Sequence, residues 1–312
     1  MSLRLNHLAL AIFFSAVGAG HGQQAVSSIT QSRLFTNPAA PGTTALETNS
    51  NAQVNRAAAS AGDDSFGTQI ILKNQERPKD FTVFGGVSVF YTNNVDLTPH
   101  GTRSDTFLAT TTGAAWRPLI AQGLILDLSA GSSVFRYDSA GELDFERITA
   151  GTGLTWVVPH GDGIIAFARY DFAELLDTDG GELIQDHAFT LGGQRTFVFG
   201  RSHFLTTGVT GVLGRSTPQS QERNQTGAHV AYHLQVTRFL GADLLYRYAA
   251  QFYRENGRLD HNQTVSLSVG FSATRWLQVE ALLSAARNDS NRSSFDYDVL
   301  NLGSGVKIGV RF

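Results

Sequence analysis

The stretch Val299–Phe312, VLNLGSGVKIGVRF, alternates between two kinds of residue and ends on an aromatic one. Counting back in twos from Phe312 gives a mostly apolar register: Val310, Ile308, Val306, Ser304, Leu302 and Leu300. The other register carries Arg311, Lys307 and Asn301 together with three glycines. A period of two is typical of a β-strand with one apolar and one polar face. Because the apolar face continues to the final residue, we expect it to meet lipid.

The composition limits the class of protein. The chain has 312 residues, 42% of them hydrophobic, no cysteine and a formal charge of -3, and its mean hydropathy is -0.10. This value is low for a bundle of membrane helices but fits a membrane β-barrel, because half of each strand faces water. The charge gives no reason to expect a nucleic-acid partner. Without cysteine there is no disulfide, thiolate metal site or lipidated cysteine, and we expect no cofactor and no metal.

The first 80 residues differ from the rest. Arg4, the apolar run 8–17 and the small residues at 18–22 predict a signal peptide over residues 1–22. Its apolar run of about ten residues is too short for a membrane helix, which needs roughly 20. Residues 23–80 are rich in Ser, Thr, Asn, Ala, Gln and Gly, which predicts a disordered periplasmic segment. The apolar island Thr68–Lys73 in it would pack at the mouth of a barrel or dock a partner.

From Phe81 onward the sequence alternates in stretches of the length that tilted membrane strands require. We predict about twelve strands, near 81–91, 105–116, 124–135, 144–158, 164–172, 187–199, 204–215, 226–237, 244–253, 264–273, 277–286 and 299–312. The even number allows both ends of the barrel domain, residues 81–312, to lie in the periplasm.

The predicted connections alternate between short and long. Short ones are 117–123, 159–163, 200–203, 238–242 and 274–276; long ones are 92–104, 137–143, 175–185, 216–224, 254–262 and 288–296. Three tryptophans, Trp116, Trp156 and Trp276, lie beside short connections, and Tyr91, Tyr137, Tyr253 and Tyr297 lie beside long ones. This distribution predicts two aromatic girdles at the two membrane interfaces.

In its closing strand and in this alternation of connections, the chain resembles Gram-negative outer-membrane β-barrel proteins. Within that class it is similar to porins of about twelve strands. The resemblance implies an all-β fold, a single antiparallel transmembrane β-barrel in the cell outer membrane, with short periplasmic turns and longer extracellular loops. It also implies contact with outer-membrane lipid and lipopolysaccharide. In this family the C-terminal aromatic strand is read by the barrel-assembly machinery, so Phe312, Val310 and Ile308 are the predicted assembly signal.

The polar register of the strands should face the interior, because Arg or Lys on the lipid side costs about 2–4 kcal/mol near the bilayer midplane. The predicted pore-lining residues are Asp127, Arg147, Arg169, Asp171, His229, His233, Arg247, Glu280 and Lys307. Two interpretations remain open. The charges pair and stiffen a filled barrel, or they line an aqueous path with a mild preference for anions.

Catalysis and metal binding were the alternatives for two motifs. Some barrels that resemble this one in size are phospholipases or lipid A deacylases, in which a serine and a histidine lie on adjacent strands. Here His229 and His233 share one strand, while Ser266 and Ser268 lie two strands along, so we expect no enzyme. The acidic residues of 175–186 surround Gly180 and Gly181; they could hold calcium or magnesium, but a solvated loop is the expectation.

The sequence favours a porin-like channel for small hydrophilic solutes or short oligosaccharides. One alternative is a non-conducting barrel that anchors, or forms part of, an envelope or polysaccharide-secretion complex and contacts a periplasmic partner through residues 23–80. An autotransporter-type translocator is a further alternative.

Overall fold

The computed structural model describes residues 80–312, apart from 160, 201 and 256. The predicted signal peptide and, except for Asp80, the predicted periplasmic segment lie outside these residues. In the described residues no helix is long and apolar enough to cross a membrane.

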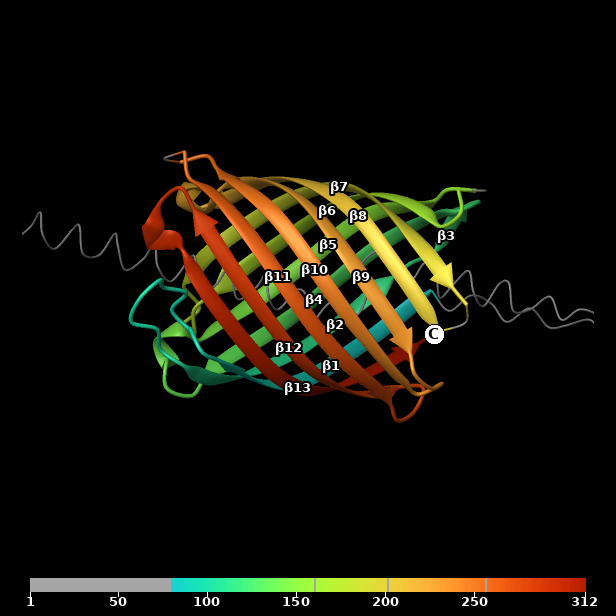
Figure 1. Ribbon diagram of the computed structural model, residues 1–312, viewed down its shortest axis with the longest axis horizontal. Helices are drawn as coiled ribbons and strands as arrows, with labels where there is room; N and C mark the ends of the chain where they lie inside the picture. Colours follow the sequence, from blue (N-terminus) through green and yellow to red (C-terminus); the bar gives the residue numbers. More distant parts are fainter. Residues whose placement is uncertain (1–79, 160, 201, 256) are drawn as a thin grey trace, which may run out of the picture.

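The described chain forms a closed antiparallel β-barrel (Figure 1). Its twelve wall strands are β1 (Phe81–Thr92), β2 (Asp105–Trp116), β4 (Leu124–Tyr137), β5 (Phe145–Val157), β6 (Ile164–Leu176), β7 (Glu182–Phe199), β8 (His203–Thr217), β9 (Arg223–Gln235), β10 (Leu240–Tyr253), β11 (Leu259–Ser272), β12 (Leu277–Ser290) and β13 (Tyr297–Arg311). Each pairs with its neighbours in sequence, and β1 pairs with β13 to close the ring. The short β3 (Leu119–Ala121) pairs with β4 beside the connection from β2. The predicted fold class is therefore confirmed.

The seam between β1 and β13 is held along its whole length. Val83 lies opposite Val310, and Thr92 lies opposite Asn301. Beyond the last paired residue, the backbone N–H of Phe312 donates to the carbonyl oxygen of Phe81 at 2.8 Å. The two phenylalanine rings have centroids 6.3 Å apart. The end of the barrel-closing strand is thus fastened to the start of the first one.

The predicted faces of β13 agree with the structure. The apolar register from Leu300 to Val310 is exposed on the outside of the barrel, whereas Asn301 and Gly303 in the other register are buried. Phe312 is 65% exposed. An outer surface of Val, Leu and Ile is what a barrel needs where its wall meets hydrocarbon.

The two ends of the barrel differ, and we call them the turn end, with connections such as 200–202 and 273–276, and the loop end, with the connection 93–104 and three 3-10 helices. These helices are η2 (Gly141–Leu143), η3 (Gln219–Gln221) and η4 (Ser293–Phe295). Several predicted loop bounds were wrong because the strands continue further at the loop end. The predicted loop 175–185, for example, is largely strand, since β6 reaches Leu176 and β7 begins at Glu182.

The tryptophan prediction is confirmed, but the tyrosine prediction is mostly wrong. Trp116, Trp156 and Trp276 all lie at the turn end and are 45–51% exposed. At the loop end only Tyr91 of the four predicted tyrosines faces outward, at 45% exposure. Tyr253 and Tyr297 are buried, and the ring of Tyr137 packs at a tilt against that of Phe107, with centroids 5.0 Å apart. The position of a residue along its strand decides at which end of the barrel it lies. The alternation of the strand decides whether its side chain points inward or outward.

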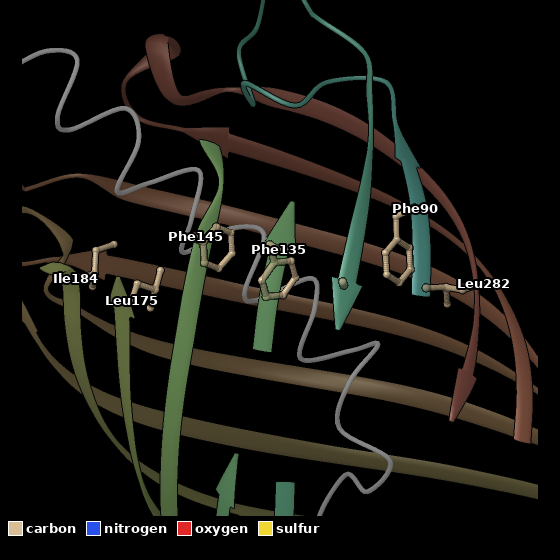
Figure 2. Packing of buried hydrophobic residues seen from close by; sticks show 7 residues of the cluster. Phe90, Phe135, Phe145, Leu175, Ile184 and Leu282 are labelled. Carbon is tan, nitrogen blue, oxygen red and sulfur yellow. The ribbon is translucent and has the colours of Figure 1, made fainter. Parts of the chain in front are cut away.

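Inward-facing side chains at the loop end form the main hydrophobic cluster (Figure 2). We call this cluster the apolar girdle; it consists of Phe90, Ala109, Phe135, Phe145, Leu175, Ile184 and Leu282. Its members come from β1, β2, β4, β5, β6, β7 and β12. The predicted polar interior is therefore incomplete: toward the loop end, seven strands also carry apolar residues on the inward face.

Candidate functional site

The interior wall is the candidate site, and Arg169 on β6 bonds to three of its residues. The guanidinium donates to Asp127 Oδ1 at 2.8 Å, to Asp171 Oδ1 at 2.7 Å and to Ser129 Oγ at 2.8 Å. Asp127 and Ser129 belong to β4, so the Arg169 side chain crosses the intervening strand β5. It does so above Gly151 and Gly153, where any Cβ would crowd it. The glycines of β5 thus make this bridge across three strands possible.

A second arginine completes the cluster. Arg117, in the connection after β2, donates from Nε to Asp127 Oδ2 at 2.7 Å. Asp127 is only 8% exposed, and it therefore holds two arginines from different parts of the chain. Two arginines and two aspartates give this part of the wall no net charge, which is how buried charges are normally accommodated.

Two further charge contacts lie elsewhere on the wall. Lys307 of β13 pairs with Glu280 of β12. His233 Nδ1 lies 2.7 Å from Asp243 Oδ1, and its Nε2 lies 3.2 Å from Gln235 Oε1. The structure therefore brings together Asp127 with Arg169 and Asp171, and Glu280 with Lys307. The sequence analysis did not single out Arg117 or Asp243, because the pairing register that places them was unknown.

Three more predicted residues, Arg147, His229 and Arg247, occupy inward positions. Arg147 on β5 is 6% exposed. His229 on β9 lies opposite Arg247 on β10 and above Gly208 on β8. A pore-lining role for the nine predicted residues stays a prediction.

The considered serine–histidine pair does not form. The imidazole of His229 and the hydroxyl of Ser266 are carried by β9 and β11, with β10 between them. Two strand spacings amount to about 10 Å, which is too far for the hydrogen bond that would activate a serine.

The acidic turn between β6 and β7 has an internal explanation. Asp177 Oδ1 accepts the backbone N–H of Asp179 at 2.7 Å, and Gly180 adopts a φ of +81°. An aspartate that binds the backbone two residues on is a common turn device. In the part of the chain that the structure describes, no group of three His, Cys, Asp or Glu residues is arranged to hold a metal ion.

A chain of aromatic contacts runs through the apolar girdle and Phe107, which packs against it. Phe90 stacks with Phe107 at a centroid distance of 5.2 Å, and Phe135 stacks with Phe145 at 4.4 Å. Phe107 connects the two pairs, with its centroid 6.4 Å from that of Phe135. Aromatic rings therefore run along the wall from β1 to β5, and the remaining girdle residues are aliphatic.

Five inward positions of β11, β12 and β13 carry polar, uncharged side chains, and the inward face of β11 continues from Asn262 to Asp260, whose carboxylate pairs with Arg258. We call this set the uncharged panel; it consists of Asn262, Thr264, Ser266, Ser284 and Asn301. All five side chains are buried. Ser284 lies opposite both Ser266 and Asn301 in the strand register, and Leu282 of the apolar girdle is two residues away on the same face.

An ion-pair cluster joins two connections at the loop end. Arg103 donates to Asp96 Oδ1 at 3.0 Å and to Glu142 Oε1 at 2.7 Å. Hydrogen bonds to Glu142 and Asp96 raise the pKa of the Arg103 guanidinium above its ordinary value. Arg103 therefore ties the connection 93–104 to η2.

On the outside, three tyrosine–histidine pairs lie between adjacent strands. Tyr170 bonds to His187 at 2.7 Å, Tyr248 bonds to His261 at 2.7 Å, and Tyr232 bonds to His203. His187 and His261 lie toward the loop end, where the predicted tyrosine girdle is mostly missing. The sequence analysis did not single out these histidines, although their register places them outside.

Comparison with known proteins supports the fold. No protein-family model matches the chain, and no curated protein matches it. Among solved structures, an outer-membrane channel from Pseudomonas putida F1 is similar, with a TM-score of 0.54 and 10% identity over 75% of this chain and 97% of that one. A bacterial polysaccharide outer membrane secretin aligns with a TM-score of 0.45 and 11% identity, over 73% of this chain and 98% of that one. The KdgM porin aligns with a TM-score of 0.39 and 7% identity, over 72% and 98%.

The likeness to the Pseudomonas channel shows the fold alone. The chain has the fold of outer-membrane β-barrels.

Proposed function

We propose that the protein is a channel in the outer membrane for small hydrophilic solutes and that it has no catalytic role. The observation that carries the proposal is the closed barrel whose wall charges are compensated locally, as in the cluster of Arg117, Asp127, Arg169 and Asp171. Such a wall offers polar groups to a solute without a strong electrostatic potential that would select cations or anions. The similar fold of the Pseudomonas channel is consistent with this role.

Single-channel recording of the refolded protein in planar bilayers tests the proposal. We expect stable open steps and, under a KCl gradient, a reversal potential close to zero. The slight anion preference predicted from the basic residues would appear as a small shift toward the chloride potential, and variants at Arg147 and Arg247 would reduce that shift.

A silent bilayer would contradict the channel, provided that heat-modifiable gel mobility shows the barrel to be folded. The protein would then be better explained as a non-conducting barrel that anchors, or forms part of, an envelope complex. Pull-down experiments with and without residues 23–80 would test that alternative, because the predicted partner contact lies in this segment.

A further inference from the structure

The uncharged panel is suited to a ligand that carries many hydroxyl groups and no charge. Its five side chains carry hydroxyls and amides, which both donate and accept hydrogen bonds. Two of them already bond within the wall: Thr264 Oγ1 donates to Asn262 Oδ1, and Asn262 Nδ2 donates to the hydroxyl of Tyr297, each at 3.2 Å. The five side chains line adjacent strands in direct register, from Ser266 through Ser284 to Asn301. Arg247 on β10 lies opposite Thr264 and therefore borders the panel.

Ser284 gives the second, independent observation. Its side chain is buried, at 1% exposure, and its Oγ has no hydrogen-bond partner among the residues that the structure describes. Buried hydroxyls are nearly always hydrogen-bonded in folded proteins, so an exception calls for an explanation such as a missing ligand. The hydroxyl lies at the centre of the panel, where a bound molecule would supply the partner.

The apolar girdle adjoins the panel and supplies the other half of the site. Leu282 lies two residues before Ser284 on the inward face of β12, and it belongs to the same cluster as Phe90 on β1. Phe90 in turn stacks on Phe107. A sugar ring has an apolar C–H face and a rim of hydroxyls, so an apolar wall next to an uncharged hydrogen-bonding wall matches both parts of it.

We propose that the loop-end half of the interior is a binding site for short neutral saccharides, with Ser284 as a hydrogen-bonding residue and the Phe90–Leu282 side as the apolar contact. This inference rests on the proposed channel function and names the class of solute. An acidic saccharide is the competing ligand, because Arg247 beside the panel would favour it, whereas Arg258 already pairs with Asp260.

The test is block of the open-channel current of the refolded full chain by maltotriose, with trigalacturonate as the acidic comparison. We expect maltotriose to block at a concentration at least about ten times lower than trigalacturonate does. Ser284→Ala should raise the half-blocking concentration of maltotriose about 3–10-fold, the usual effect of losing one neutral hydrogen bond. Ser272→Ala is the matched control, since it is the same change on an inward residue at the turn end of β11.

Open channels that maltotriose does not block would overturn the inference and leave the channel intact. Stronger block by trigalacturonate, or equal effects of Ser284→Ala and Ser272→Ala, would also overturn it. If no channel opens, the proposed function fails first. Calorimetric titration of maltotriose into the folded barrel in detergent then tests the binding site independently of conductance. Binding that Ser284→Ala weakens would support the site, and the absence of binding would refute it. Phe90→Leu provides a second variant in case Ser284→Ala folds poorly.

Discussion

Gly303 and Gly309 lie on the same inward face of β13 but in different surroundings. The Phe90 ring covers Gly303, whereas no atom of the described residues lies within 4 Å of a Cβ added at Gly309. We expect Gly303→Ala to lower the free energy of unfolding by about 1–3 kcal/mol, because the ring must leave its place. Gly309→Ala should change it by less than about 0.5 kcal/mol. Urea unfolding in lipid vesicles measures both, and equal midpoints would show that the ring moves freely.

The bridge from Arg169 to Asp127 should be energetically coupled. Asp127→Ala leaves two arginines short of a partner, and we expect a loss of about 2 kcal/mol in unfolding free energy. In a double-mutant cycle with Arg169→Ala, the double variant should lose less than the sum of the single variants by about 1 kcal/mol or more. The exposed pair Arg287–Asp289, joined at 2.8 Å, is the control and should show coupling below about 1 kcal/mol. Similar coupling in both cycles would mean that burial adds nothing to the bridge.

Among the connections, the link from Arg103 to η2 should respond to salt rather than to alkaline pH. The raised pKa keeps Arg103 charged throughout the neutral and mildly alkaline range. Its contribution is therefore fully present below the ordinary arginine pKa and is lost only above the raised value. Arg103 is 40% exposed, so Arg103→Ala should cost less than about 1 kcal/mol but should speed proteolysis of the connection 93–104 several-fold. Cleavage that is unchanged by this variant and by high salt would show that backbone contacts alone hold the connection.

At the scale of elements, the alternating pattern predicted the strands well and their loop-end limits poorly. Most predicted strands coincide with observed ones, since the period of two continues through each membrane span. The errors begin where a strand leaves the lipid, because residues such as Leu175 and Ile184 are then apolar on the inward face and break the expected alternation. The pairing of the inward charges could not be predicted from the sequence for another reason. Arg169 and Asp127 are separated by β5, so their contact depends on register and on Gly151 and Gly153 together.

For the whole molecule, the tryptophans give an optical measure of how the barrel sits in a bilayer. All three lie at the turn end and face outward, where the sequence predicts a membrane interface. Lipids brominated near the headgroup end of the acyl chain should therefore quench fluorescence more strongly than lipids brominated near the terminal methyl. Single Trp→Phe variants should each remove part of the signal without changing this order. Stronger quenching from the terminal methyl would place the tryptophans in mid-membrane and contradict the assigned span.

The seam between β1 and β13 also has a consequence for how the protein is made. Until β13 docks, β1 and β12 each present a row of unpaired backbone groups, and such edges invite pairing with other chains. Every partly folded stage before closure therefore has two unpaired edge strands, through which it can aggregate. We therefore expect the chain to need a chaperone until β13 pairs with β1. A variant that weakens the contact between Phe81 and Phe312 should be lost to aggregation and proteolysis in the cell, even if the closed barrel itself is stable.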